Sequence, residues 1–180
     1  MDKRTFSILV ADDDDIAREV VRSILAADGY VVATAADGTD AILKLNENPF
    51  DMVITDLRMP GAGGMEVLKH AIGQKATACV VILTAYGSID TTLEALRQGA
   101  YDYLAKPFKG QEIRYLAERA FQRHTLIRQN EALRGLLREC LLEGAGEGDL
   151  RDGDRTGRGL DAAMLDGRIE SLGVLTAEEV

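Results

Sequence analysis

Five charged or hydroxyl side chains stand where predicted strands of this 180-residue chain end: Asp12, Asp13, Asp56, Thr84 and Lys106. Because the carboxyl ends of parallel strands meet at one edge of a sheet, we expect all five at the same edge. Three carboxylates in one place repel one another unless a cation lies among them, and hard oxygen ligands suit Mg²⁺. With a lysine as a fixed positive charge and a hydroxyl donor, such a set would form a phosphoryl site whose nucleophile is a carboxylate.

Taken singly, these residues also have plain structural interpretations. Acids that precede a helix are favourable at its positive end, and Asp14 and Asp15 are assigned to that role. A threonine after a strand is usually a turn residue. Pro107 pushes Lys106 into an extended conformation, and their peptide bond can be cis. The joint pattern at one sheet edge, rather than any single residue, favours a site.

The elements that must position these side chains alternate along the chain. Short apolar runs predict strands over 6–11, 30–34, 51–56, 79–84 and 100–105. Helical spacing follows each strand, over 16–27, from Gly38 to Asn48, around 65–72, between Ser88 and Gly99, and from Gly110 to about Glu143. The order predicts an α/β fold: a five-stranded, doubly wound parallel sheet with helices on both faces, an extended C-terminal helix and a flexible tail.

Apolar periodicity also predicts which helix faces pack on the sheet. In the helix over 16–27, Ile16, Val20 and Ile24 recur at helical spacing, with charged side chains outside. In the last helix, residues 113–120 carry the sheet-packing positions, namely Ile113, Leu116 and Ala120.

From Leu126 the last helix changes to a heptad repeat, whose seam is Leu126, Asn130, Leu133, Leu137 and Cys140. An Asn at an a-type position is a device that fixes register and strand number in coiled coils. The sequence therefore predicts a parallel homodimer that uses residues 126–141. The alternative is a solvated linker helix with a few leucines, because two heptads are too short to be stable alone.

Composition divides the chain into three parts: a compact domain over 1–122, the helix extension over 123–143, and a Gly-rich acidic tail over 144–180. The tail holds few large apolar residues to offset its ordering entropy, so it is predicted to be disordered.

Charge and cysteine content restrict the setting. The net charge of −9 argues against direct contact with nucleic acid or anionic lipid. No apolar run is long enough to span a membrane, and the N-terminus has no signal-peptide pattern. Cys79 and Cys140 stand far apart and in no metal spacing, which favours a reduced, cytoplasmic location.

Four stretches together carry a family resemblance: Ile8–Asp13, Asp56–Gly61, Leu83–Ala85 and Gly99–Phe108. In this order and spacing they are similar to the receiver domain of bacterial two-component response regulators, over about residues 5–122. The chain most resembles the receivers of enhancer-dependent transcriptional activators. The resemblance implies the flavodoxin-like receiver fold and a place in a phosphorelay.

The resemblance also implies residue roles. Asp56 would accept a phosphoryl group from a sensor histidine kinase. Asp12, Asp13, Asp56 and the backbone carbonyl of Arg58 would hold Mg²⁺. Lys106 would complete the site. Thr84 and Tyr103 would change position together on phosphorylation.

The implied output is a change of surface rather than turnover of a substrate. The helix between Ser88 and Gly99, the strand over 100–105 and the last helix would form the responding face, which also serves the homodimer. The chain would be a phosphoprotein that catalyses only its own phosphotransfer and dephosphorylation. Arg58 and Tyr86 occupy positions that screen attacking water, so the lifetime of the phosphorylated state stays open.

Other activities fit less well. A haloacid-dehalogenase-type phosphatase needs a second Asp two residues after its nucleophile, where this chain has Arg58. A flavodoxin-like FMN binder needs a phosphate-cradling loop after its first strand, where four aspartates stand over 12–15. The glycines over 144–148 follow a helix rather than a strand and do not form a dinucleotide site. Two output arrangements stay open: a stand-alone receiver acting through protein contacts, or a piece of a longer regulator.

Overall fold

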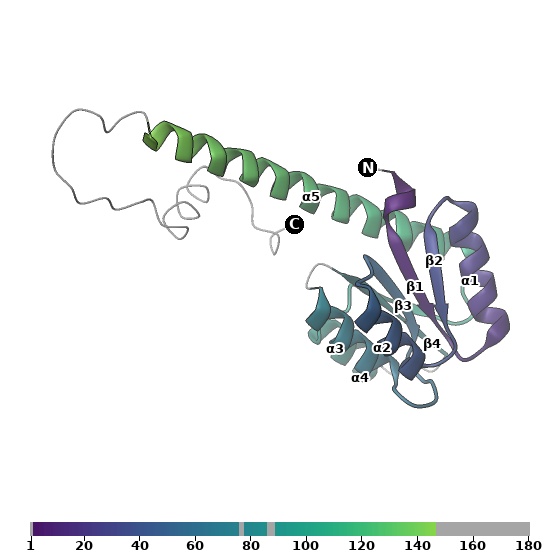
Figure 1. Ribbon diagram of the computed structural model, residues 1–180. Coiled ribbons are helices and arrows are strands. Elements are labelled where there is room, and N and C mark those ends of the chain that lie inside the picture. Colours follow the sequence, from purple (N-terminus) through teal and green to yellow (C-terminus); the bar gives the residue numbers. More distant parts are fainter. Residues whose placement is uncertain (1, 76–77, 86–88, 147–180) are drawn as a thin grey trace. The chain divides into compact units, whose positions relative to one another are not determined.

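The computed structural model describes residues 2–75, 78–85 and 89–146 (Figure 1). Its strands are β1 (Ser7–Ala11), β2 (Val31–Ala35), β3 (Met52–Asp56), β4 (Cys79–Thr84) and β5 (Asp102–Ala105). Its helices are the 3₁₀ turn η1 (Lys3–Thr5), α1 (Asp15–Ala27), α2 (Gly38–Glu47), α3 (Gly64–Gln74), α4 (Ile89–Arg97) and α5 (Gly110–Gly146). The predicted alternation of strands and helices is confirmed, with small shifts at element ends.

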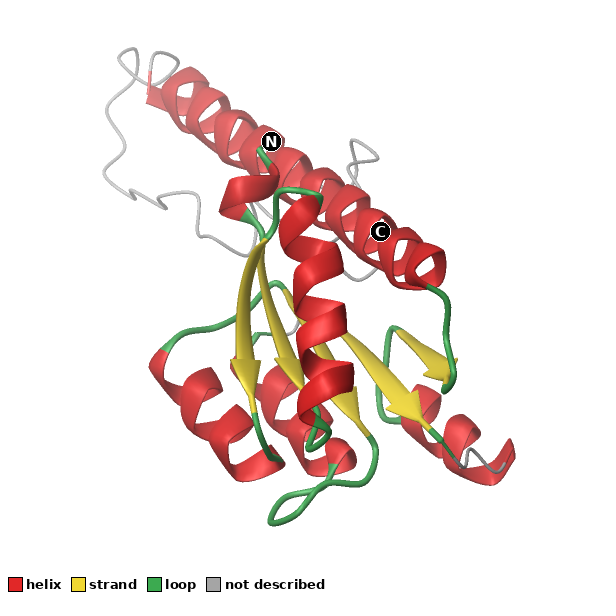
Figure 2. Ribbon diagram, turned by 90° about the vertical axis from the view of Figure 1, so that its right-hand side faces the viewer, coloured by secondary structure: helices red, strands yellow, loops and turns green. Residues whose placement is uncertain are grey.

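The five strands form one parallel sheet in the order β2-β1-β3-β4-β5. All the strand arrows in Figure 2 point to the same edge. Strand β2 lies on one side of β1, and β3 lies on the other side of β1. The strand order therefore reverses between β1 and β3. Open α/β sheets place their sites at this switch point, outside the carboxyl ends of the strands.

Both faces of the sheet are covered, because the central strands are apolar on both sides. In β1, Ile8 and Val10 face one core together with residues of α1 and α5. Leu9 and Ala11 face the other core, together with residues of α2, α3 and α4. The doubly wound arrangement is therefore confirmed.

The buried face of α1 differs from the prediction. Ile16 is 77% exposed and Val20 is 47% exposed, whereas Val21 and Leu25 are fully buried. Of the predicted stripe, only Ile24 packs against the core, and it is partly buried. Helix α1 carries two apolar stripes, and periodicity alone did not identify the one that faces the sheet.

Local signals at helix ends are as expected. The Asp14 side chain caps α1 by accepting hydrogen bonds from the amides of Ile16 and Ala17. Gly99 follows α4 with a φ of +95°, the left-handed conformation that suits a helix C-terminus. Ser88, where the sequence places the start of this helix, lies outside the described residues.

The chain divides into two compact units, Met1–Gln122 and Arg123–Val180. Helix α5 is continuous through Gly146, which confirms an extended C-terminal helix. In the second unit Leu126, Leu133 and Leu136 are more than half exposed. The predicted tail lies outside the described residues from 147 onward. No helix in the described part of the chain is both long and apolar enough to cross a bilayer.

Candidate functional site

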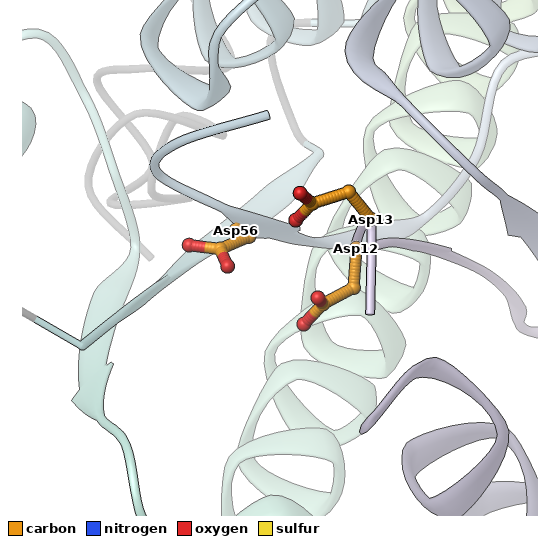
Figure 3. Close-up of side chains that lie close together, drawn as sticks. All are labelled: Asp12, Asp13 and Asp56. Carbon is orange, nitrogen blue, oxygen red and sulfur yellow. The ribbon is translucent and has the colours of Figure 1, made fainter. Parts of the chain in front are cut away.

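Three carboxylates meet at the carboxyl edge of the sheet (Figure 3). Asp12 and Asp13 follow β1, and Asp56 is the last residue of β3. One oxygen from each side chain can be chosen so that all three lie within 4.8 Å of one another. β1 and β3 are hydrogen-bonded neighbours, so their ends bring together residues 43 positions apart (13 to 56) in the sequence.

Lys106 holds two of these acids together. Its Nζ lies 2.6 Å from Asp12 Oδ2 and 2.6 Å from Asp56 Oδ2. Burial acts to lower the pKa of Lys106, but hydrogen bonds to Asp12 and Asp56 outweigh it and raise the pKa above its ordinary value. Lys106 therefore stays a cation at neutral pH. Its peptide bond to Pro107 is cis.

Asp12 is the buried member of the cluster. Its side chain is 1% exposed, against 13% for Asp56, and Asp13 is exposed. Burial raises the pKa of the Asp12 carboxyl, while hydrogen bonds from Lys106 and from the Asp14 amide act in the opposite direction. Three carboxylates and one ammonium leave the cluster negatively charged, a condition that attracts a further cation.

The backbone of the Asp12 strand end is fixed by an arginine that the sequence interpretation missed. Arg18 Nη1 donates to the Asp12 carbonyl at 2.6 Å, and its other terminal nitrogen pairs with Asp15. The i to i+6 separation places Arg18 on the first turns of α1, near the strand end. No motif signals such a side chain-to-backbone contact.

A pocket of about 210 Å³ opens beside Asp56 and is lined by Asp56, Leu57, Arg58, Thr84 and Ala85. Thr84 is 5% exposed. The Arg58 amide donates to Asp56 Oδ1 at 3.3 Å. The pocket is several times larger than one water, about 30 Å³ in the liquid, and so has room for a phosphoryl group beside Asp56.

The loop after Asp56 depends on a close backbone approach at Gly64. A Cβ on Gly64 would lie 2.2 Å from the Asp56 carbonyl oxygen and 2.9 Å from Leu57 Cα. The Gly64 amide donates to the Leu57 carbonyl at 3.0 Å. The sequence shows the glycine-rich run over 61–64. It does not show which of these glycines the neighbouring backbone approaches closely.

Tyr103 lies apart from this pocket. It is 44% exposed on β5 and lines a separate hollow of about 290 Å³ with Leu104 and the first turns of α5. Thr84 and Tyr103 stand on the hydrogen-bonded strands β4 and β5, whose register pairs Ile82 with Tyr103. Tyr86, the other position named in the sequence, lies outside the described residues.

The donor set fits a hard divalent cation. The three side chains of the cluster, Asp12, Asp13 and Asp56, all offer carboxylate oxygens, and the exposed Asp13 leaves the cluster open to water. Mg²⁺ binds through few protein carboxylates and keeps several waters, which suits a cluster at the surface.

The sequence profile of the response regulator receiver domain matches residues 8–118. The transcriptional regulatory protein ZraR of Klebsiella oxytoca is 44% identical over 100 residues, which cover 56% of this chain and 23% of that protein. The C4-dicarboxylate transport transcriptional regulatory protein DctD of Pseudomonas aeruginosa is 34% identical over 132 residues, 73% of this chain and 29% of its own length. The chain thus spans about a quarter of the length of these relatives.

Solved structures of receiver domains are similar to this chain. A response regulator receiver domain protein from Clostridium thermocellum is 33% identical with a TM-score of 0.63, covering 67% of this chain and 98% of that one. The beryllofluoride-activated NtrC4 receiver domain dimer is 29% identical with a TM-score of 0.61, covering 64% of this chain and 96% of that one.

Proposed function

Because the chain belongs to the response regulator receiver domain family, we propose that it accepts a phosphoryl group on Asp56 from a sensor histidine kinase. The observation that carries this proposal is the joint contact of Lys106 with Asp12 and Asp56, at 2.6 Å each, beside a pocket next to Asp56. Only Asp56 is both a member of the acid cluster and a lining residue of that pocket.

In the transfer, one Asp56 carboxylate oxygen forms a bond to phosphorus. The bond between phosphorus and the donor's histidine nitrogen breaks, and its electron pair returns to the imidazole. Lys106 neutralises charge on the phosphoryl oxygens, a role that needs positioning rather than bond formation. Asp12, Asp13, Asp56 and the Arg58 carbonyl would hold Mg²⁺. When bound, this ion supplies the remaining positive charge at the phosphoryl oxygens.

The product is a mixed anhydride that water hydrolyses, so the modified state is temporary. Ala85 and Arg58 both line the pocket, and the small Ala85 side chain favours an open path for water to Asp56. The chain therefore acts as a phosphoprotein that catalyses its own phosphotransfer and dephosphorylation, and turns over no other substrate.

Phosphorylation would be read through Thr84 and Tyr103. The phosphoryl group adds nearly two negative charges and strong acceptors next to Thr84, whose hydroxyl can donate to it. Movement of Thr84 toward Asp56 leaves space behind it, and Tyr103 turns inward from its half-exposed position. The face formed by α4, β5 and α5 changes as a result.

The proposed output is a parallel homodimer. Its two contact regions are the α4-β5-α5 face and the seam over residues 126–141, which carries the exposed Leu126 and Leu133. The NtrC4 receiver is described as a dimer in its activated form, and the curated relatives are transcriptional regulators. This chain would act in the bacterial cytoplasm through protein contacts and would not itself bind nucleic acid or membrane.

The proposal is tested by incubating the protein with phosphorylated histidine kinases and Mg²⁺ and measuring the intact mass. One phosphoryl group per chain is expected with a cognate kinase, and none in Asp56→Asn. Asp14→Asn is the matched control, because Asn also caps a helix and the fold is preserved. Equal labelling of wild type and Asp56→Asn would refute the assignment.

A further inference from the structure

An aromatic cluster holds α5 at the amino-terminal edge of the sheet, opposite the acid cluster. Phe6 precedes β1, Tyr30 precedes β2, and Phe121 lies on α5. The three rings meet edge to face: the centroids are 5.8 Å apart for Phe6 and Tyr30, 5.6 Å for Phe6 and Phe121, and 6.1 Å for Tyr30 and Phe121. Such pairs add specificity of orientation to the burial of the rings.

An ionic contact reinforces the same turn of α5. Lys3 Nζ lies 2.7 Å from Glu118 Oε2, and the Tyr30 hydroxyl donates to the same oxygen at 3.3 Å. Lys3 Nζ also lies 4.8 Å from the centroid of the Tyr30 ring, within range of a cation–π interaction. Lys3 is held in place because it belongs to η1, which Asp2 caps.

The first turns of α5 have a different neighbour. Tyr103 and Leu104 of β5 line one side of the hollow of about 290 Å³, and Gln111, Glu112, Tyr115 and Leu116 of α5 line the other. In the function proposed above, Tyr103 moves on phosphorylation. Phe121 and Glu118 instead contact Phe6 and Tyr30, which precede β1 and β2, and Lys3 of η1. None of these three residues belongs to the proposed switch.

We infer that Lys3, Phe6, Tyr30, Glu118 and Phe121, here named the α5 clamp, form the pivot of α5 and couple phosphorylation at Asp56 to the helix beyond Gln122. A shift of the first turns then turns the helix about the clamp. Without the clamp, the same shift is absorbed by local opening of residues 118–122. This inference rests on the proposed function.

Two clamp variants test it by hydrogen exchange, with intact mass measured on the same samples. Phe121→Leu removes the edge-to-face contacts but keeps an apolar side chain, and Lys3→Met removes the charge. Phe50→Leu, in the core on the other side of the sheet, and Arg22→Met, from the exposed pair with Glu19, are the matched controls.

Without phosphodonor, amides over 118–122 should exchange faster than in wild type and the controls, by about fivefold in Phe121→Leu and by about twofold in Lys3→Met. With acetyl phosphate and Mg²⁺, wild type and controls should show altered exchange over 103–116 and over 123–140. The clamp variants should also take up one phosphoryl group. Their exchange should change over 103–116 as in wild type, but not over 123–140.

Unchanged exchange over 118–122, or a wild-type response over 123–140 in both clamp variants, overturns the inference. A phosphorylated wild type that shows no response over 123–140 overturns it as well. A wild type that gains no phosphoryl mass overturns the proposed function and the coupling with it, and the mass measurement separates that failure from the others.

Discussion

At the scale of single residues, the acid cluster combines unlike aspartates. Asp12 is buried and bonded to Lys106, whereas Asp13 is exposed. Asp56 is intermediate in exposure, and of the three aspartates only Asp56 lines the pocket of about 210 Å³. These differences suit the proposed roles, in which Asp12 positions Lys106 and shares the cation with Asp13, and Asp56 accepts the phosphoryl group.

The metal role of Asp13 predicts that Asp13→Ala abolishes Mg²⁺ binding and phosphorylation while leaving the fold intact. Because a repelling carboxylate is removed, the metal-free melting temperature should rise slightly. Titration calorimetry with Mg²⁺ and a thermal melt measure both effects. Asp14→Asn should bind Mg²⁺ as wild type does, and an Asp13→Ala protein with unchanged affinity would contradict the proposed metal site.

The sequence predicts the acids and Lys106 at one edge because each stands at the end of a strand or directly after it, and the carboxyl ends of parallel strands meet at one edge. It did not reveal Arg18 as a donor to the Asp12 carbonyl, since that contact depends on the path of α1. Nor did it show Tyr103 as half exposed, because burial at a strand on the sheet edge depends on which helices cover it.

At the scale of the elements, periodicity identified α1 but not its buried face. Both stripes of α1 are apolar at helical spacing, and only the packing of Val21 and Leu25 on the sheet distinguishes them. The prediction for α5 was correct: Ile113, Leu116 and Ala120 are buried. Among the residues between them, Arg114, Glu118 and Arg119 are polar and Ala117 is buried on the same face, whereas Tyr115 is exposed.

The loop between β3 and α3 should not tolerate a side chain at Gly64. Gly64→Ala would place a Cβ 2.2 Å from the Asp56 carbonyl oxygen, so we expect a loss of about 1–3 kcal/mol in the free energy of unfolding and slower phosphorylation. Gly73→Ala on the same helix meets nothing within 4 Å and should stabilise by up to about 1 kcal/mol. Urea unfolding measures both, and equal stability of the two variants would contradict the close approach.

The ion pair in the α5 clamp should depend on pH. Hydrogen bonding to Lys3 lowers the pKa of Glu118 below its ordinary 4.5, and hydrogen bonding to Glu118 raises the pKa of Lys3 above its ordinary 10.5. The stabilisation is therefore fully present between the two ordinary pKa values, from about pH 4.5 to pH 10.5. It is lost as pH falls through the lowered pKa of Glu118, and again as pH rises through the raised pKa of Lys3.

A double-mutant cycle with Lys3→Met and Glu118→Gln measures this contribution by urea unfolding. Both side chains are about a third or more exposed, so solvent screening limits the coupling energy at pH 7 to about 0.2–1 kcal/mol. It should approach zero at a pH well below 4.5. A coupling energy that is the same at both pH values would show that the pair is not ionic.

At the scale of the whole molecule, the fold was predictable because strands and helices alternate with short connections, which permits few topologies. The arrangement of the second unit was not predictable in the same way. Its exposed Leu126, Leu133 and Leu136 have no core of their own in the described residues. Leu136 is not one of the predicted seam positions but is next to Leu137, so the apolar stripe is wider than the predicted heptad repeat.

The dimer proposal predicts that mild oxidation links Cys140 of one chain to Cys140 of another, because parallel helices in register place them opposite each other. Cys140 is exposed, whereas Cys79 is buried. Leu133→Asp with Leu137→Asp should prevent the link, while the pair Arg128→Asp and Arg138→Asp outside the seam should not abolish it. Light scattering that shows a monomer at micromolar concentrations, with and without phosphodonor, would rule the dimer out.

The most direct test of the central claim is the identity of the modified residue. After phosphorylation with acetyl phosphate and Mg²⁺, reduction with borohydride converts an aspartyl phosphate to homoserine, and peptide sequencing by mass spectrometry locates it. We expect homoserine at position 56 alone, absent without phosphodonor or after removal of Mg²⁺ by a chelator. Homoserine at position 12 or 13, or a phosphoryl group that survives reduction on another side chain, would contradict the assignment of Asp56.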